Sequence, residues 1–246
     1  MIELTGVAKV YPGSATPAIH DIDMTILRSE FVAIIGPSGS GKSTLLNLMG
    51  CLDRPTSGQL IFLGENTAKL SDMRLSRLRN RSIGFVFQTF NLVPELTVRE
   101  NVELPLVYAG VSRNRRALTL KALDDVGIAH HAEKRAALLS GGEQQRAAIA
   151  RALVTDPPLI LADEPTGSVD SETAEQVMAL LRELHDQGRS IVVVTHHPEV
   201  AAAAHRVVRL ESGTVPHLIK AAPRPEAVSR QGVASMGAAR LAGASE

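Results

Sequence analysis

The stretch that decides the fold is Gly36-Pro37-Ser38-Gly39-Ser40-Gly41-Lys42-Ser43-Thr44, which directly follows the apolar run 31–35, Phe-Val-Ala-Ile-Ile. It fits G-x-x-x-x-G-K-[ST], and its place between an apolar strand and a helix start is the context of a phosphate-binding loop. The glycines let several backbone N–H groups point at one anion, and the positive end of the helix faces the same point. The alternative is a glycine-rich turn before an ordinary helix, which the preceding strand disfavours.

Two side chains of the loop add chemistry to the backbone. Lys42 supplies a mobile positive charge that can reach the β- and γ-phosphates of a bound nucleotide. Ser43 supplies a hydroxyl that can ligate Mg²⁺, which prefers oxygen ligands. The sequence therefore predicts a site for a nucleoside triphosphate together with Mg²⁺.

The composition limits the kind of protein. Of 246 residues, 44% are hydrophobic and only 3% are aromatic, so we expect an aliphatic core in one large or two small domains. Lys+Arg and Asp+Glu both number 26, and this charge balance does not indicate a general affinity for nucleic acid. The single cysteine, Cys51, excludes an internal disulfide framework and is expected to be a small buried residue.

Membrane and targeting signals are not visible in the sequence. No apolar stretch approaches the ~20 residues needed to cross a bilayer. Glu3 and Lys9 interrupt any apolar core of an N-terminal signal segment. We therefore expect a cytosolic protein, unless a partner holds it at a membrane.

The apolar runs and turn signals predict an α/β protein. Two or three strands are expected within residues 1–35, and others at 59–62, 83–87, 159–162, 191–194 and 207–210. Helical periodicity covers 97–154, with breaks near Gly110, Gly127 and Gly141-Gly142, and a helix is expected over 172–187. The runs 159–162 and 191–194 are continuously apolar, as in parallel strands buried on both faces.

This order of elements gives antiparallel strands, an α/β core, a helical insertion and then the α/β core again. Residues 216–246 are rich in Ala, Pro, Gly and Ser and lack clear periodicity. We expect this tail to be weakly ordered or disordered.

Asp163 and Glu164 follow the apolar run 159–162. A buried parallel strand delivers them to its carboxyl end, where ligands gather in open α/β sheets. There Asp163 can hold Mg²⁺, and Glu164 can polarise a water molecule aimed at the γ-phosphate. The alternative is a strand that ends in surface acids, but a phosphate-binding loop in the same chain favours the functional interpretation.

A third element is the stretch 139–146, Leu-Ser-Gly-Gly-Glu-Gln-Gln-Arg. Ser140 can cap a helix whose exposed N–H groups face an anion. An ordinary N-cap does not require the two glycines that follow, which cost conformational entropy. Taken with the loop and the Asp-Glu strand, this string resembles the ATP-binding cassette (ABC) ATPases, whose signature motif matches residues 139–143.

The resemblance covers about residues 1–215 and implies the fold and activity of that family. The implied fold is a P-loop NTPase (RecA-like) α/β core with an antiparallel β subdomain and an inserted α-helical subdomain at about 89–156. The implied activity is the binding and hydrolysis of ATP, with Mg²⁺ as cofactor.

The functional residues of the family carry over position by position. Tyr11 matches the aromatic residue that stacks on adenine, and Gln88 matches the glutamine that contacts Mg²⁺ and the attacking water. Asp170 matches the loop that crosses the dimer interface, and His196 matches the switch histidine at the γ-phosphate. The implied catalytic residues are Glu164, His196, Gln88 and Lys42, and the implied Mg²⁺ ligands are Ser43, Gln88 and Asp163. The implied nucleotide site comprises Tyr11, Gly36, Ser38, Gly39, Ser40, Gly41, Lys42, Ser43, Thr44, Gln88, Ser140, Gly141, Gly142, Glu143, Asp163, Asp170 and His196.

The signature motif implies a partner, because in this family it closes on the nucleotide of a second chain. The implied assembly is a head-to-tail dimer, in which Ser140 and Gly142 of one copy seal the ATP that Lys42 holds in the other. ATP is then a component of the interface, and its hydrolysis removes the bridge.

The wording of residues 88–106 resembles the subfamily that contains lipoprotein-releasing and macrolide-exporting ATPases. It implies an integral membrane permease with four transmembrane helices and a large extracytoplasmic domain. Through this permease the chain would sit peripherally on the cytoplasmic face of the inner membrane. Residues 168–170 read Ser-Val-Asp where the subfamily usually has Asn-Leu-Asp, a departure that keeps Asp170 but shortens the first polar side chain.

Two other functions compete with an ATPase subunit that powers a membrane transporter. One is a nucleotide-gated, weakly hydrolytic regulator of a cell-envelope or division complex. The presence of all the hydrolytic residues argues against this function. The other is a soluble cassette ATPase acting on DNA or ribosomes, but this chain has one cassette and no heptad insertion. The transported substrate is not encoded here, because its contacts lie on the permease.

Overall fold

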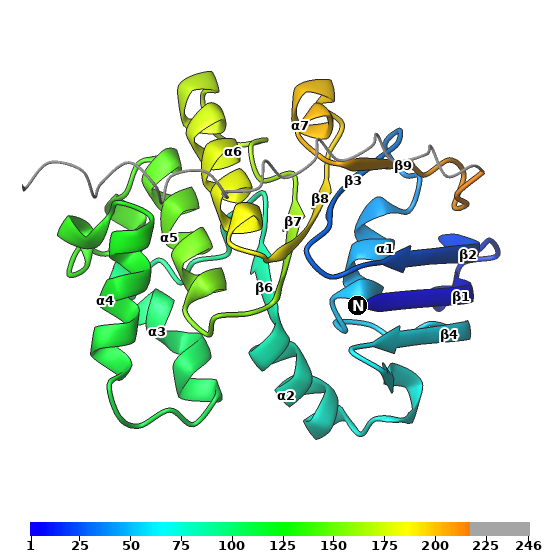
Figure 1. The fold of residues 1–246 in the computed structure, drawn as a ribbon, viewed down its shortest axis with the longest axis horizontal. Coiled ribbons are helices and arrows are strands. Elements are labelled where there is room, and N and C mark those ends of the chain that lie inside the picture. The colour runs from blue at the N-terminus through cyan, green and yellow to red at the C-terminus, as the bar shows by residue number, and fades with distance from the viewer. Residues whose placement is uncertain (217–246) are drawn as a thin grey trace, which may run out of the picture.

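Two β-sheets form the frame of the protein in a computed structural model, in which residues 1–216 are described. The strands are β1 (Ile2–Lys9), β2 (Ile19–Ile26), β3 (Phe31–Ile35), β4 (Ser57–Phe62), β5 (Glu65–Asn66), β6 (Ile83–Val86), β7 (Leu159–Asp163), β8 (Ser190–Val194) and β9 (Arg206–Arg209). The core sheet is parallel, in the order β6-β7-β8-β3-β9. The second sheet is antiparallel, in the order β2-β1-β4-β5 (Figure 1).

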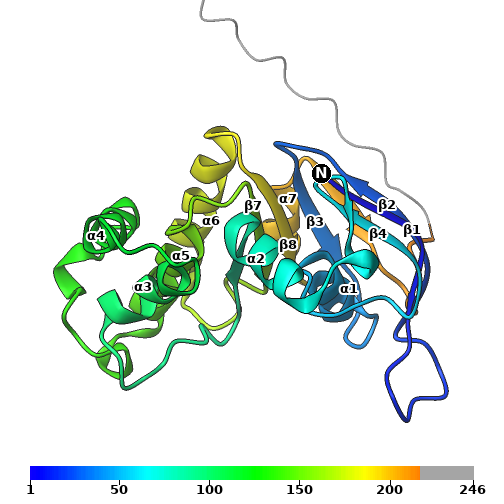
Figure 2. The same cartoon turned by 90° about the horizontal axis from the view of Figure 1, so that it is seen from below.

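The described residues also form seven α-helices, three of which lie together at one end of the molecule. The α-helices are α1 (Lys42–Met49), α2 (Asp72–Ser82), α3 (Val98–Tyr108), α4 (Arg115–Asp125), α5 (Gly141–Leu153), α6 (Ser171–Asp186) and α7 (Pro198–Ala202), and short 3-10 helices cover Thr67–Lys69, Ala129–His131 and Ala136–Leu138. Figures 1 and 2 place α3, α4 and α5 at one end, the antiparallel sheet at the other, and the core sheet between them. Among the described residues, no helix is both long and apolar enough to cross a membrane.

Strand β7 shows why the core sheet has continuous apolar runs. Leu159 and Leu161 pack into the cluster that contains α1, whereas Ile160 and Ala162 pack into the cluster that contains α5 and α6. Successive side chains of a strand point to opposite faces, so a strand covered on both sides needs apolar residues at every position. All four side chains are fully buried.

Helix α1 fills the space between the two sheets. Its Leu45, Leu46 and Leu48 are buried in the same cluster as Ile2 of β1 and Leu161 of β7. Each such leucine contributes about 1.5–3 kcal/mol by leaving water. The start of α1, and the glycine loop before it, is therefore held on a rigid support.

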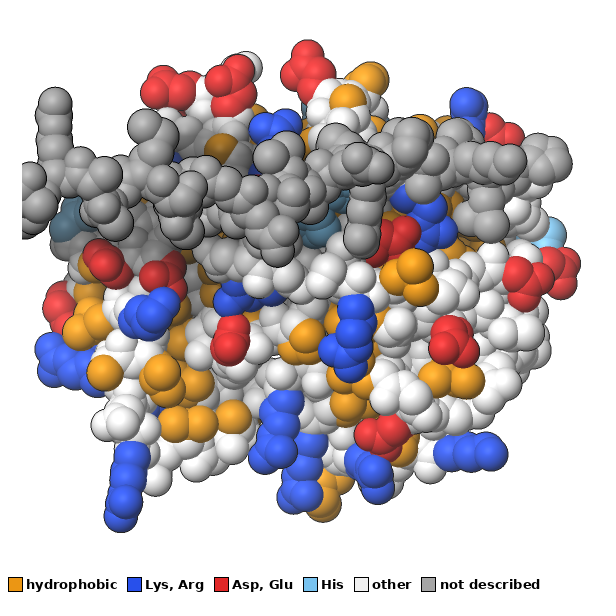
Figure 3. Space-filling view, in the orientation of Figure 1, with side chains coloured by type: hydrophobic (Ala, Val, Ile, Leu, Met, Phe, Trp, Pro, Cys, Tyr) orange, Lys and Arg blue, Asp and Glu red, His pale blue; other side chains and the backbone are white. Residues whose placement is uncertain are grey.

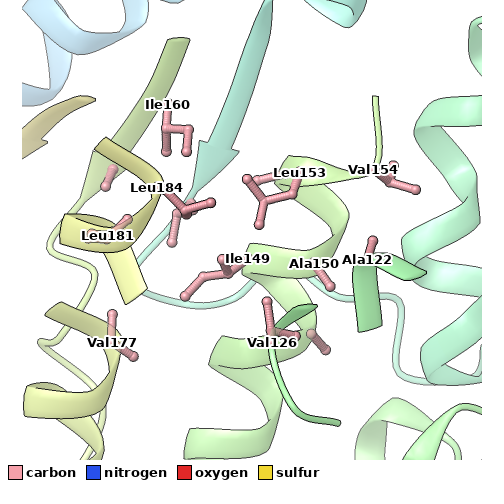
Figure 4. Packing of buried hydrophobic residues seen from close by; sticks show 14 of the residues in the cluster. Ala122, Val126, Ile149, Ala150, Leu153, Val154, Ile160, Val177, Leu181 and Leu184 are labelled. Atoms are coloured by element: carbon pink, nitrogen blue, oxygen red, sulfur yellow. The ribbon is translucent and has the colours of Figure 1, made fainter. Parts of the chain in front are cut away.

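Helix α5 joins the helical end to the core sheet. Its residues Ile149 and Leu153 share a buried cluster with Leu181 of α6, Val126 after α4 and Ile160 of β7 (Figure 4). Alanines along α5 are fully buried as well, and their small side chains let neighbouring elements approach closely. The first turn of α5 is thereby fixed relative to the end of β7.

The predicted strands are confirmed, with shifts of one or two residues at their ends. Residues 1–35 hold three strands, of which β3 belongs to the core sheet, and the helix expected over 172–187 is α6. Two helices were not predicted: α7 is short, and α2 has Leu75 as its one buried hydrophobic residue, too little for a periodic signal. Residues 217–246 lie outside the described residues, and so does the tail prediction that falls on them.

Candidate functional site

The predicted catalytic residues lie at one edge of the core sheet. Strands β6, β7, β8 and β3 are neighbours and run parallel, so all four end at this edge. Gln88 follows β6, Asp163 ends β7 and Glu164 comes next, His196 follows β8, and Lys42 begins the helix after β3. The sheet thus gathers residues that are far apart in the chain.

The loop between β3 and α1 requires glycine. A Cβ atom on Gly36 would lie 2.2 Å from the carbonyl oxygen of Leu210, and one on Gly41 would lie 2.5 Å from that of Ala18. Gly39 and Gly41 also have positive φ angles of 77° and 99°. The hydroxyl of Ser40 is buried and has no hydrogen-bond partner among the described residues. The closely packed backbone of the loop and the free hydroxyl of Ser40 fit the binding of a phosphate chain.

Positive charge lies over the same loop. The Nζ atom of Lys42 donates hydrogen bonds of 2.9 Å to the carbonyl oxygens of Gly36 and Pro37. Helix α1 starts there without a side-chain cap, so its first N–H groups remain for an anion. Ser38 and Gly39, at the tip of the loop, are exposed. The loop therefore meets the requirements for triphosphate binding that the sequence predicted.

Asp163 and Ser43 face each other beside the loop. Burial raises the pKa of Asp163, and the negative charge of Glu164 acts in the same direction. A hydrogen bond from the Ser43 side chain and the charge of Lys42 oppose this rise. A half-buried carboxyl next to a hydroxyl is a set of hard oxygen donors, which fits Mg²⁺.

Glu164 is held in a defined position. Its backbone has a φ angle of 45°, rare for a residue with a side chain, and its N–H donates to the carbonyl oxygen of Val194 at 2.9 Å. Its Oε2 accepts a 3.1 Å hydrogen bond from the hydroxyl of Thr195, and its Oε1 lies 2.6 Å from Nδ1 of His196. Thr195 is fully buried, and the sequence did not predict a role for it, because a threonine at a strand end has no distinctive pattern.

Gln88 lies against the loop that follows Glu164. A Cβ atom on Gly167 would come within 2.9 Å of the Gln88 Nε2 atom, so the glycine allows this approach. Gln88 itself is exposed, one residue after Phe87 and two after the end of β6. Its amide is therefore next to the segment that carries the predicted general base.

The first turn of α5 is built by a capping box. The Ser140 hydroxyl accepts from the Glu143 N–H at 3.4 Å, and the Glu143 carboxylate accepts from the Ser140 N–H at 2.7 Å. The hydrogen bond from the Ser140 N–H is the main cause that lowers the pKa of Glu143. Nε2 of His131, a residue for which the sequence predicted no role, lies 2.7 Å from the second oxygen of Glu143. The helix start is thus rigid and exposed at Ser140.

Asp170 lies close to the same turn. It is the N-cap of α6, where its carboxylate accepts hydrogen bonds from the N–H and the hydroxyl of Thr173 at 2.9 and 2.7 Å. The bond from the Thr173 N–H is the main cause that lowers the pKa of Asp170. A Cβ atom on Gly142 would lie 2.8 Å from Cγ2 of Thr173. Gly142 therefore lets the starts of α5 and α6 meet.

Tyr11 lies near the first turn of α1. Its hydroxyl is 3.5 Å from Oγ1 of Thr44, and its ring is partly exposed. The Nζ atom of Lys9 lies 5.1 Å from the ring centroid. An exposed aromatic face beside the phosphate loop is suited to stacking on a base.

The predicted residues form two groups, which one chain does not bring together. The first group surrounds the phosphate loop at the start of α1, and the second surrounds Ser140 at the start of α5. Figures 1 and 2 both show α5 and α1 on opposite sides of strands β7 and β8. A nucleotide in the phosphate loop therefore meets the signature stretch only if another chain supplies it.

Known proteins resemble this chain both in sequence and in fold. The family model described as "ABC transporter" matches residues 19–167. An uncharacterized ABC transporter ATP-binding protein of Thermotoga maritima is 47% identical over 238 residues, which cover 95% of this chain and 97% of that one. The macrolide export ATP-binding/permease protein MacB 2 of Aeromonas hydrophila is 48% identical over 218 residues, 87% of this chain but only 34% of the relative's length.

The structural neighbours include the cassette MJ0796. A dimeric post-hydrolysis form of it bound to ADP and Pi superposes with a TM-score of 0.82 at 44% identity, covering 88% of this chain and 97% of that chain. A second dimeric structure of MJ0796 gives the same TM-score at 45% identity. The chain belongs to the ABC transporter family, as an ATP-binding and ATP-hydrolysing cassette of the P-loop NTPase fold.

Proposed function

We propose that two copies of this chain pair head to tail and enclose ATP, and that the closing and opening of this dimer powers a membrane permease. The observation that carries the proposal is the separation of the two groups of site residues within one chain. Ser140 is exposed at the N-terminus of α5, and α5 lies on the other side of strands β7 and β8 from α1, the helix that follows the phosphate loop. A second copy would add the N–H groups and hydroxyl of that turn to the far side of the triphosphate.

The roles of the residues follow from their chemistry and placement. The loop at residues 36–44 and Lys42 would bind the phosphates, and Tyr11 would stack on the base. Ser43, Asp163 and Gln88 would hold Mg²⁺, which shields the charge of the phosphate oxygens when bound. Asp170 would order the loop at the dimer interface through its cap on α6.

Hydrolysis depends on Glu164 as general base. Its Oε1 accepts the proton of the attacking water, while the hydroxyl of Thr195 holds Oε2 in place. His196 contacts the same carboxylate at 2.6 Å and would orient the γ-phosphate through its exposed ring. The preorganised carboxylate then needs no rearrangement when the proton moves.

The Glu164→Gln variant tests this proposal. Gln keeps the shape of the side chain but cannot accept the proton, so we expect ATP binding without turnover and an ATP-bound dimer in size-exclusion chromatography. Glu175→Gln, at an exposed position of α6, is the matched control and should hydrolyse ATP normally. Phosphate release by Glu164→Gln at the wild-type rate would refute the assignment.

A groove of about 980 Å³ between α2, α3 and β6 is the proposed contact with the permease. Its lining includes the apolar side chains of Leu52, Phe87 and Leu104, and Tyr108, which is 81% exposed. Arg77, Arg79, Arg81 and Arg151 also line it, and no Asp or Glu does. Figure 3 shows Lys and Arg side chains gathered at the edge of the molecule over α2. An amphipathic cytoplasmic segment with acidic residues would fit this groove.

A photo-crosslinking residue at Tyr108, introduced into the full chain in cells, tests the contact. We expect it to trap an integral membrane protein with four predicted spans and a large external domain. The same residue at Leu118 of α4, also exposed, is the control. Reversing charge with Arg77→Glu and Arg81→Glu should reduce the crosslink and leave the ATPase activity of the isolated chain unchanged. A soluble protein in the crosslink, or none, would contradict the proposal.

The remaining features of the proposal follow from this arrangement. We place the ATPase domain at residues 1–215, with its helical subdomain at about 89–156, and the protein peripherally at the cytoplasmic face of the inner membrane. MacB 2 carries a permease part in its own chain, as its name says, and this chain spans about a third of its length. An integral membrane permease would act together with this cassette and would determine which substrate is moved.

A further inference from the structure

His197 is a second histidine beside the catalytic carboxylate, and the proposed mechanism does not use it. Glu164, His196 and His197 each offer one ligand atom, and these atoms all lie within 4.8 Å of one another. The rings of His196 and His197 have centroids 4.1 Å apart and planes inclined by 36°. Two imidazoles and one carboxylate thus converge at the end of β8.

The backbone around these three side chains is constrained. The hydroxyl of Thr195 donates to Glu164 at 3.1 Å and accepts from the N–H of His197 at 3.0 Å. Pro198 follows at the first position of α7 and fixes the direction in which the chain leaves. A single fully buried hydroxyl therefore positions the carboxylate and the histidine segment relative to each other.

The donor set selects a class of metal. Two imidazole nitrogens and one carboxylate oxygen, with a fourth position left open, are the ligands of an accessible Zn²⁺ site. The hard oxygens of Ser43 and Asp163, by contrast, suit Mg²⁺. The His196 side chain is 62% exposed and His197 is exposed, so a cation can reach both.

We propose that Glu164, His196 and His197 bind Zn²⁺ or a similar divalent transition metal, and that the bound ion stops ATP hydrolysis. The ion replaces the hydrogen bond between Glu164 Oε1 and His196 Nδ1, and these atoms move apart from 2.6 Å to the roughly 3.3 Å that separates two ligands of a tetrahedral zinc ion. The carboxylate is then a metal ligand and cannot accept the proton of water. This second part, inhibition, rests on the proposed role of Glu164, whereas metal binding does not.

Calorimetric titration of the full-length, chelator-treated protein with ZnCl₂, without nucleotide, tests the site itself. We expect one ion per chain for the wild type. His197→Asn removes one ligand and keeps a good N-cap for α7. The substitution should weaken zinc binding by more than 10–100-fold, which is the typical effect of losing a residue that only hydrogen-bonds to a metal ligand. His130→Asn, which alters the other adjacent histidine pair, should leave binding unchanged.

Phosphate release with saturating Mg²⁺ and ATP tests the inhibition. We expect His197→Asn to hydrolyse ATP at the wild-type rate without zinc and to resist a zinc concentration that inhibits the wild type. Equal zinc affinity of the wild type and His197→Asn would overturn the site. Loss of binding in His197→Asn combined with a zinc-insensitive wild type would overturn the inhibition. A separate result would show that Glu164 is not the general base: hydrolysis of ATP by Glu164→Gln in the absence of zinc.

Discussion

The guanidinium of Arg151 donates a hydrogen bond of 2.7 Å to the carbonyl oxygen of Phe90, and a second to that of Asn91. Arg151 lies near the end of α5, the helix that begins with the signature stretch, and Phe90 lies two residues after Gln88. Phe90 and Asn91 have positive φ angles of 60° and 51°, a conformation that a non-glycine residue keeps only when its surroundings hold it. One side chain therefore ties the Gln88 loop to the signature helix.

Arg151→Ala should release this loop. The half-buried carbonyl oxygen of Phe90 and the exposed one of Asn91 lose their donor, so we expect the free energy of unfolding to fall by about 1–3 kcal/mol. Amide exchange at residues 88–96 should accelerate more than in the rest of the chain. Arg151→Lys should restore the protection of this loop only in part, because an ammonium does not present the planar fork of a guanidinium. Arg116→Ala, at an exposed position of α4, is the control, and equal exchange in both variants would contradict the link.

Thr195→Val should slow hydrolysis without weakening nucleotide binding. The substitution keeps the shape of a fully buried side chain but removes the hydroxyl that donates to Glu164 at 3.1 Å. Hydrogen bonds to charged groups contribute about 1.5–3 kcal/mol, so we expect kcat to fall by at least about tenfold. Thr195→Ser restores the hydroxyl and should recover most of the rate. An unchanged kcat would show that the carboxylate needs no such support.

Gly141→Ala and Gly142→Ala should differ, although the two glycines are adjacent. A Cβ atom on Gly141 would lie 3.4 Å from its nearest neighbour, an ordinary contact, whereas one on Gly142 would lie 2.8 Å from Cγ2 of Thr173. We expect Gly142→Ala to cost about 1–3 kcal/mol by overpacking. Gly141→Ala should be neutral or slightly stabilising, since alanine favours a helix. Urea unfolding measures both, and Thr173→Ser should reduce the cost at Gly142 by removing the methyl group.

Mixed dimers should reveal shared sites. We expect Lys42→Ala and Ser140→Arg each to abolish phosphate release when alone, because every site of either dimer is damaged. In a head-to-tail pair of one with the other, both defects fall in the same site and the second site is intact. Random mixing should therefore recover about a quarter of wild-type activity if the sites act independently. Absence of any recovery, with mixed pairs verified by mass spectrometry, would argue against the shared site.

The ionised carboxylates of Asp163 and Asp170 should have opposite effects on the free energy of unfolding at pH 7. Burial raises the folded-state pKa of Asp163, so its contribution is favourable below its unfolded pKa and is lost as the pH rises through the folded value. Asp163→Asn should therefore raise Tm at pH 7 without nucleotide or Mg²⁺, and the gain should disappear near pH 4. Hydrogen bonds from Thr173 lower the pKa of Asp170, so its contribution is present at pH 7 and is lost as the pH falls. Asp170→Asn should lower Tm at pH 7, and scanning calorimetry at both pH values separates the two cases.

The sequence was informative wherever a local pattern has one physical meaning. Three features lie where their patterns predicted: the glycine loop, the strands buried on both faces, and the Asp-Glu pair at the end of β7. Helix α2 shows the limit, because one buried leucine in 11 residues gives no periodic signal and its polar surface looks like a loop. Thr195 and His131 were missed for a related reason: each acts through one partner that is distant in the chain.

The sequence by itself determined which chemical groups the protein has and at which strand ends they occur, since glycine, apolar alternation and capping act over a few residues. Only the tertiary structure decided which of these groups meet. Glu164 and Thr195 are 31 residues apart and Arg151 and Phe90 are 61 apart, and each pair depends on how sheets and helices pack. The same packing keeps the signature turn away from its own phosphate loop, because α5 and α1 cover opposite sides of the core sheet's central strands.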